Sequence, residues 1–216
     1  MKYKGILFDL DGTLLDTTEL IVKSFQHTFR VHYNRDITPA DVHPFFGQTL
    51  RAAMEHLGPD KVEELIATYR DYNITHHDRL TTAFTGVVEV LQELYNAGAA
   101  MAIVTSKTQG TALRGLRLFD LDKYFTAVIG VEQCQKHKPD PEPVLTAIKE
   151  LGLTAADCLM VGDSPHDIIS AKRAGAHTAA VRWTQVPWRS IIAEKPDYIL
   201  NTMEDLFFIC EISRPK

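Results

Sequence analysis

Short apolar runs alternate with segments of helical spacing through most of the chain. The apolar runs are typical of buried strands and cover residues 6–8, 99–104, 127–129, 158–161, 178–181 and 198–200. Segments with helical spacing of apolar residues lie between or after these runs, at residues 87–96, 108–118, 141–151, 165–174 and from 203. This alternation predicts an α/β fold, Rossmann-like, in which helices cover both faces of a mainly parallel sheet.

A purely helical block interrupts this alternation after the first strand. Helical spacing occurs at residues 18–30, 49–57 and 60–72, and no strand-like segment precedes about residue 79. We therefore expect an α/β core domain made of residues 1–15 and 81–216, with a helical domain inserted at residues 16–80.

Composition narrows the possible environments and partners. The net charge of −5 gives no reason to expect nucleic acid or an anionic membrane as a partner, and no stretch has the apolar length of a membrane span. The three cysteines are scattered, without a CxxC pair, which predicts unpaired thiols in a cytoplasmic protein. The sequence is compatible with a monomer or a small homo-oligomer.

The end of the first strand carries two carboxylates. If residues 6–8 form a strand, its alternation places Asp9 and Asp11 near the same side of its end. Like charges held close together favour a bound cation or a shared proton, and one carboxylate could attack an electrophile while the other moves a proton. The alternative is a plain hairpin turn, because Asp-Gly after an apolar run is a strong turn signal.

Polar groups also follow the other expected strands, and carboxyl ends of parallel strands share one edge of a sheet. Each group has a structural alternative: a helix cap for Thr105 or Ser106, a solvated loop for Lys138, and a helix start for the segment 164–167. Together the groups predict one site, to which the strand ends contribute Thr105, Ser106 and Lys107, then Lys138, and then Asp163 and Asp167.

The chemistry common to these residues is phosphoryl transfer. Asp9, Asp11 and Asp163 are hard oxygen donors of the kind that Mg²⁺ prefers, usually together with a substrate phosphate. A carboxylate nucleophile can form an aspartyl-phosphate, while magnesium, a lysine and hydroxyl groups neutralise the phosphoryl oxygens.

In this order the residues resemble the motifs of the haloacid dehalogenase superfamily. Asp9-Leu10-Asp11-Gly12-Thr13 matches its DxDGT motif, and Thr105 matches the hydroxyl residue that follows a strand. Lys138 matches the motif lysine, and Gly162-Asp163-Ser164-Pro165-His166-Asp167 matches GDxxxD. Four motifs in sequence make this resemblance specific.

The resemblance implies roles for these residues. Asp9 would be the nucleophile and Asp11 the acid–base, and the second carboxylate favours phosphate chemistry over dehalogenation. Thr105 and Lys138 would bind phosphate, while Asp9, the Asp11 carbonyl and Asp163 would hold Mg²⁺, supported by Asp167. The helical block would be a mobile cap over the site.

A closer similarity is to the bacterial inorganic pyrophosphatase branch of the superfamily. It rests on the segments 18–21, 24–28, 67–73, 77–78, 138–144 and 166–167. Pyrophosphate needs more donors than the four motifs supply, for which the candidates are Lys107, Gln48, Arg70 and His76 or His77. A solvated position is the alternative for Arg70, Gln48 and both histidines.

We therefore expect a Mg²⁺-dependent phosphohydrolase acting on pyrophosphate or another small phosphorylated compound. Phosphoglycolate phosphatases share the four motifs, and a phosphomutase or a non-catalytic phosphate-binding protein are further alternatives.

Overall fold

A six-stranded sheet, parallel throughout, forms the centre of the computed structural model, which describes residues 1–213. The sequence predicted all six strands to within one residue at each end. Their order across the sheet is β5 (Ala127–Ile129), β4 (Ala100–Val104), β1 (Gly5–Phe8), β6 (Cys158–Gly162), β7 (His177–Val181) and β8 (Tyr198–Leu200).

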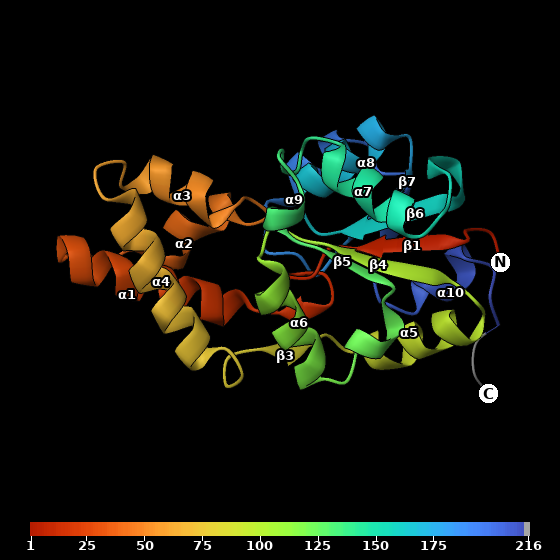
Figure 1. Ribbon diagram of the computed structural model, residues 1–216, viewed down its shortest axis with the longest axis horizontal. Helices are drawn as coiled ribbons and strands as arrows, with labels where there is room; N and C mark the ends of the chain where they lie inside the picture. Colours follow the sequence, from red (N-terminus) through yellow and green to blue (C-terminus); the bar gives the residue numbers. More distant parts are fainter. Residues whose placement is uncertain (214–216) are drawn as a thin grey trace.

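Alternating side chains of the strands supply two separate cores. Ile6 and Phe8 of β1 point to one face, which is covered by α5 (Val87–Asn96), α6 (Gln109–Leu118) and α10 (Asp205–Ile209). Leu7 points to the other face, under α7 (Glu142–Glu150) and α8 (Pro165–Ala174), with α9 (Trp188–Ala193) beside α8 (Figure 1). Both faces are therefore covered, as the alternation of strands and helices predicted.

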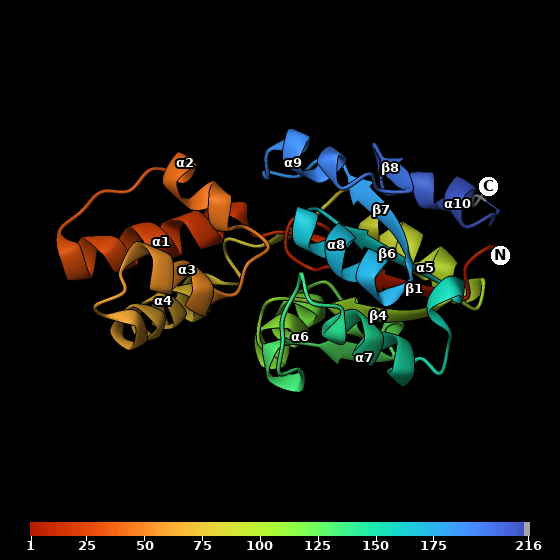
Figure 2. The same ribbon diagram turned by 90° about the horizontal axis from the view of Figure 1, so that it is seen from above.

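Four helices form a separate layer beyond the carboxyl ends of the strands. They pack around their own apolar core, to which Phe25, Phe29, Met54 and Leu65 contribute. Figures 1 and 2 show this group lying to one side of the sheet. We call it the helical unit, and it consists of α1 (Thr18–Tyr33), α2 (Pro39–Val42), α3 (Leu50–Leu57) and α4 (Val62–His76), with their connecting loops.

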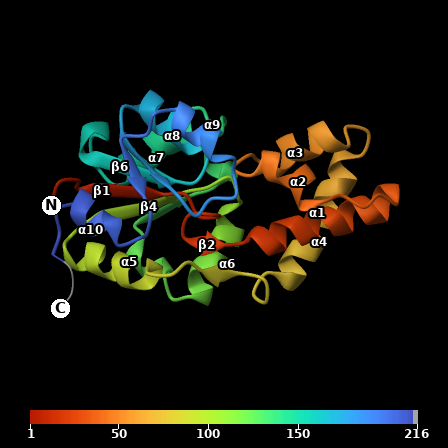
Figure 3. The same ribbon diagram turned by 180° about the vertical axis from the view of Figure 1, so that it is seen from behind.

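Two short strands join the helical unit to the sheet. β2 (Leu15–Asp16) and β3 (Thr82–Ala83) pair antiparallel, with Leu15 opposite Ala83 (Figure 3). The sequence analysis did not predict them, because two residues are too few to show an alternation. They lie near the predicted boundaries of the helical domain at residues 16–80, and this division stays a prediction.

Helix ends differ from the sequence expectations for local reasons. α1 continues to Tyr33, where Asn34 adopts a left-handed conformation with φ of 47° and ends it. α4 runs to His76, four residues beyond the expected end. α7 begins at Glu142, because the backbone nitrogen of Glu142 donates to Asp140 Oδ1 at 3.0 Å. Within residues 1–213, no helix is long and apolar enough to span a bilayer.

Candidate active site

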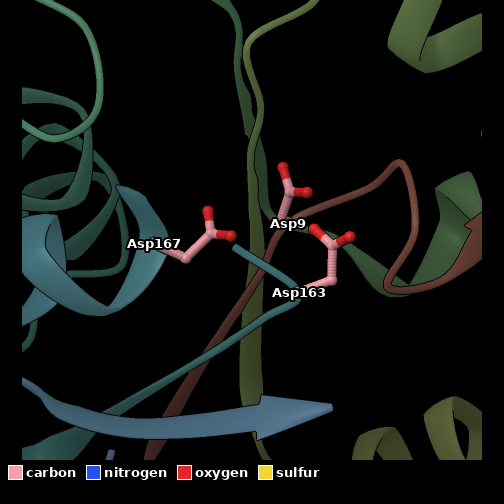
Figure 4. Close-up of side chains that lie close together, drawn as sticks. All are labelled: Asp9, Asp163 and Asp167. Atoms are coloured by element: carbon pink, nitrogen blue, oxygen red, sulfur yellow. The ribbon is translucent and has the colours of Figure 1, made fainter. Parts of the chain in front are cut away.

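Two buried aspartates follow the two central strands. Asp9 comes directly after β1 and is 4% exposed, and Asp163 comes directly after β6 and is 3% exposed. From β1 the chain proceeds to β4 and β5 on one side and then crosses to β6 on the other side. Ligands of open α/β sheets bind at such a reversal, beyond the carboxyl ends of the strands. Figure 4 shows both carboxylates at this position, beside Asp167.

Lys138 holds the cluster together. Its Nζ donates to Asp9 Oδ1 at 2.8 Å, to Asp167 Oδ1 at 2.6 Å and to the Val104 carbonyl at 2.9 Å, so all three ammonium protons are used. Burial alone would lower the pKa of Lys138, but the carboxylates of Asp167 and Asp9 outweigh it and raise that pKa. The lysine is therefore a fixed buried cation, and the alternative of a solvated loop lysine was wrong.

Asp167 serves both the helix and the cluster. Its Oδ2 accepts hydrogen bonds from the backbone nitrogen of Ser164 at 3.0 Å and from its hydroxyl at 2.7 Å, which caps α8. Its other oxygen binds Lys138. Both carboxylate oxygens thus have protein partners, which suits a supporting position.

Burial and the repulsion between neighbouring charges disfavour the ionised forms of these carboxylates. Burial raises the pKa of Asp9 to about 7, with Lys138 opposing and Asp167 adding to the shift. The pKa of Asp163 is also raised, first by burial and then by the charges of Asp9 and Asp167. A bound divalent cation would stabilise the charged forms.

The donor set fits a divalent-metal site. Oxygens from Asp9, Asp163 and Asp167 lie within 4.8 Å of one another. These are hard donors, suited to an alkaline-earth cation. Glycine at position 12 leaves room for the Asp163 carboxylate: its φ is +81°, and a Cβ there would lie 2.3 Å from Asp163 Oδ2.

Asp11 lies in a different environment from the other aspartates. Its Oδ1 accepts from Lys107 Nζ at 2.6 Å and from the Thr17 hydroxyl at 2.6 Å. Asp11 is absent from the three-carboxylate group just described. Its carboxylate is thus fixed between a cation and a hydroxyl next to the cluster.

The loop after β4 contacts the helical unit. Thr105 is buried and its hydroxyl accepts from the Lys107 backbone nitrogen at 3.2 Å, whereas the Ser106 hydroxyl donates to the Gly47 carbonyl at 2.9 Å. Neither residue caps α6, because Thr108 accepts from the Thr111 nitrogen instead. The capping alternative for Thr105 and Ser106 was therefore wrong.

A cavity of about 530 Å³ lies between the strand ends and the helical unit. The strand ends line it with Asp9, Asp11 and the segment 105–108, and the helical unit lines it with residues of α1, α3, α4 and the loop before α3. Gln48 and Arg70 also line it, and the Gln48 amide donates to the Pro44 carbonyl at 3.1 Å.

The two histidine candidates do not line this cavity. His76 packs its ring on Tyr72, with centroids 4.2 Å apart. His77 is buried and bonded to Asp78 at 2.8 Å, so the expectation of a solvated loop was wrong for His77.

Several residues near the site escaped the sequence analysis. Thr184 follows β7 and its hydroxyl donates to the carbonyl of Asp163 at 2.8 Å, so the strand-end rule could have found it. Tyr69 and Asn73 line the cavity from α4. Nothing in their spacing distinguishes them from helix-packing residues.

Comparison with known proteins agrees with this geometry. The family model of haloacid dehalogenase-like hydrolases matches residues 6–181. A relative in Caldanaerobacter subterraneus subsp. tengcongensis is 46% identical, over 97% of this chain and 95% of its own. Pyrophosphatase PpaX of Bacillus cereus is 43% identical over 95% of each chain, and that of Halalkalibacterium halodurans is 40% identical over 97% of each.

The fold is shared with solved structures. A haloacid dehalogenase-like family protein of Streptococcus pneumoniae superposes with a TM-score of 0.87 at 22% identity, over 97% of this chain and 99% of that one. This similarity is one of fold. This protein belongs to the haloacid dehalogenase-like hydrolases.

Proposed function

We propose that this hydrolase cleaves inorganic pyrophosphate into two orthophosphates, with Mg²⁺ as cofactor and an aspartyl-phosphate on Asp9. The observation that carries the proposal is the buried ion pair of Lys138 with Asp9, because Asp9 lines the cavity together with Asp11. The choice of pyrophosphate rests on the near full-length similarity to two proteins named pyrophosphatase PpaX.

In the first step an oxygen of Asp9 attacks one phosphorus atom, and the bond from that phosphorus to the bridging oxygen breaks. Asp11 donates its proton to the departing phosphate. Lys138 holds Asp9 in place and keeps a positive charge next to it. Thr105, directly after β4, would bind an oxygen of the transferred phosphoryl group.

In the second step water attacks the phosphorus of the aspartyl-phosphate, Asp11 takes a proton from this water, and the bond from phosphorus to Asp9 breaks. One residue thus serves both as acid and as base. Asp9, Asp163 and the Asp11 carbonyl would hold Mg²⁺, which when bound neutralises charge on the phosphoryl oxygens. Asp167 supports this arrangement through Lys138 and Ser164.

The remaining candidates would bind the second phosphoryl group. Lys107 supplies a cation 2.6 Å from Asp11 Oδ1, and Ser106 and Gln48 lie on the same cavity. We propose that the helical domain at residues 16–80 acts as a mobile cap that excludes water. The free cysteines among the described residues agree with a cytoplasmic location.

The test begins with phosphate release from pyrophosphate, phosphoglycolate, sugar phosphates and nucleotides in the presence of Mg²⁺. Asp9→Asn should abolish turnover, and EDTA should abolish it reversibly. Asp157→Asn, which alters a surface ion pair with Lys4, is the matched control and should retain full activity. Normal turnover by Asp9→Asn would contradict the nucleophile assignment.

The substrate panel separates the alternative activities. A strong preference for phosphoglycolate would overturn the choice of pyrophosphate while leaving the chemistry of Asp9 intact. A phosphoryl group moved within a sugar, without release of orthophosphate, would identify a mutase.

A further inference from the structure

The helical unit lines the cavity with apolar side chains and with several polar ones, among them the charged groups of Arg51, Glu63 and Arg70. Near the middle of α4, Tyr69 and Asn73 are one helical turn apart and therefore share a face. Both line the cavity, although they are only 9% and 5% exposed. The apolar side chains around them include Ile21, Phe25, Phe45, Phe46, Leu50 and Ile66.

Ser24 of α1 fixes the orientation of the Asn73 amide. The Ser24 hydroxyl donates to the Leu20 carbonyl at 2.7 Å, so its only proton is used and its oxygen is left to accept. Asn73 Nδ2 lies 3.2 Å from that oxygen and is the donor. One proton of Nδ2 is thereby occupied, and the amide lies beside the Tyr69 hydroxyl.

Tyr69 is held in place by packing and by the same polar group. Its ring stands edge-on to Phe25, with centroids 5.1 Å apart and an interplanar angle of 68°. Its hydroxyl lies beside the side chains of Ser24 and Asn73. Burial, and then the negative charge of Asp11, raise the pKa of Tyr69, so the hydroxyl stays protonated.

The in-line geometry of phosphoryl transfer directs the leaving group toward this side of the cavity. In phosphoryl transfer the attacking and leaving oxygens lie roughly in line on opposite sides of phosphorus. Asp9 attacks from the floor of the cavity, at the end of β1. The leaving group therefore points away from the sheet, toward the helical unit.

We propose that Tyr69 and Asn73 bind the leaving phosphoryl group of pyrophosphate and so favour pyrophosphate over phosphate esters with apolar leaving groups. This inference rests on the proposed pyrophosphatase activity and adds two specificity-determining residues to it. Neutral donors suit this position because Lys107, which also lines the cavity, already supplies a cation.

The experiment compares kcat/KM for pyrophosphate with kcat/KM for 4-nitrophenyl phosphate, whose leaving group is aromatic and carries no phosphate. In Tyr69→Phe, and separately in Asn73→Ala, the ratio of the two values should fall about tenfold or more, because each variant removes a hydrogen bond to a charged group. Tyr72→Phe is the matched control on the same helix. Tyr72 stacks with His27, 4.6 Å between centroids, and its ratio should equal that of the wild type.

The outcomes separate the two proposals. Wild-type protein that fails to hydrolyse pyrophosphate overturns both the proposed function and this inference. Wild-type activity together with an unchanged ratio in Tyr69→Phe overturns this inference alone. Equal losses with both substrates, accompanied by a lower melting temperature, would show a purely structural role and would also overturn it.

Discussion

Replacing Lys138 with methionine tests the electrostatic account of the site. The substitution keeps an unbranched chain of similar length but removes a buried ammonium that makes three hydrogen bonds. Asp9 and Asp167 then lose the cation that they share. Breaking a buried ion pair by removing one partner costs about 3–5 kcal/mol. We expect the free energy of unfolding to fall by that amount in EDTA at pH 8.5.

The expected loss depends on pH, with a sign set by Asp9. In the wild type the pKa of Asp9 is raised to about 7, far above its value in the unfolded chain, so its proton leaves the folded protein near pH 7. Lys138 lowers that pKa, so the variant should keep the proton to higher pH. Above pH 7 the folded variant still binds this proton whereas the unfolded chain does not, so the variant continues to lose stability as the pH rises after the wild type has stopped doing so. The cost of the substitution should therefore grow above pH 7, by up to about 1.4 kcal/mol per pH unit.

Urea unfolding followed by tryptophan fluorescence measures this effect at pH 6 and at pH 8.5. A loss of 3–5 kcal/mol corresponds to a midpoint lower by about 1–3 M. Lys136→Met is the matched control, because this neighbouring lysine is 72% exposed and should change stability by less than about 1 kcal/mol. Equal midpoints for Lys138→Met and Lys136→Met at pH 8.5 would refute the reasoning.

Two further predictions concern metal binding and the contact between the helical unit and the sheet. Because the pKa values of Asp9 and Asp163 are raised, Mg²⁺ must displace protons from them at low pH. The rise in melting temperature with Mg²⁺ should therefore be larger at pH 8 than at pH 6. Equal rises at the two pH values would contradict this. Gly47→Ala should lower kcat/KM about tenfold, since φ is +81° and the new Cβ would lie 2.7 Å from Ser164 Oγ. Gly98→Ala has a similar φ of +83° with nothing within 4 Å, and should lower stability slightly without changing kcat/KM.

The sheet and its cluster could be predicted because they depend on local patterns and one rule of topology. Each strand carries its own apolar run, and parallel strands bring the residues after them to one edge. This reasoning was enough to place Asp9, Lys138 and Asp163 together. The hydrogen bond from Lys138 to Asp9 and the short distances between the carboxylate oxygens of Asp9 and Asp163 now show this grouping.

The contacts across the cavity could not be predicted in the same way. The bond from the Ser106 hydroxyl to the Gly47 carbonyl joins residues 59 positions apart, one in the loop after β4 and the other in the helical unit. Such contacts depend on how the helical unit sits over the sheet. Helical periodicity indicates which residues share a face, but not which face meets the cavity. The roles of all these site residues in turnover stay predictions.

The pairing of β2 with β3 has a consequence for how this enzyme can be altered. Because Leu15 and Ala83 are opposite each other, the chain leaves the sheet layer and returns to it at nearly the same point, about 5 Å apart. A replacement insert of any length is compatible with the remaining scaffold if its own ends meet at that spacing. We expect that grafting a different insert between these two strands would change which molecules reach the strand ends, provided that the graft keeps Thr17, whose hydroxyl donates to Asp11.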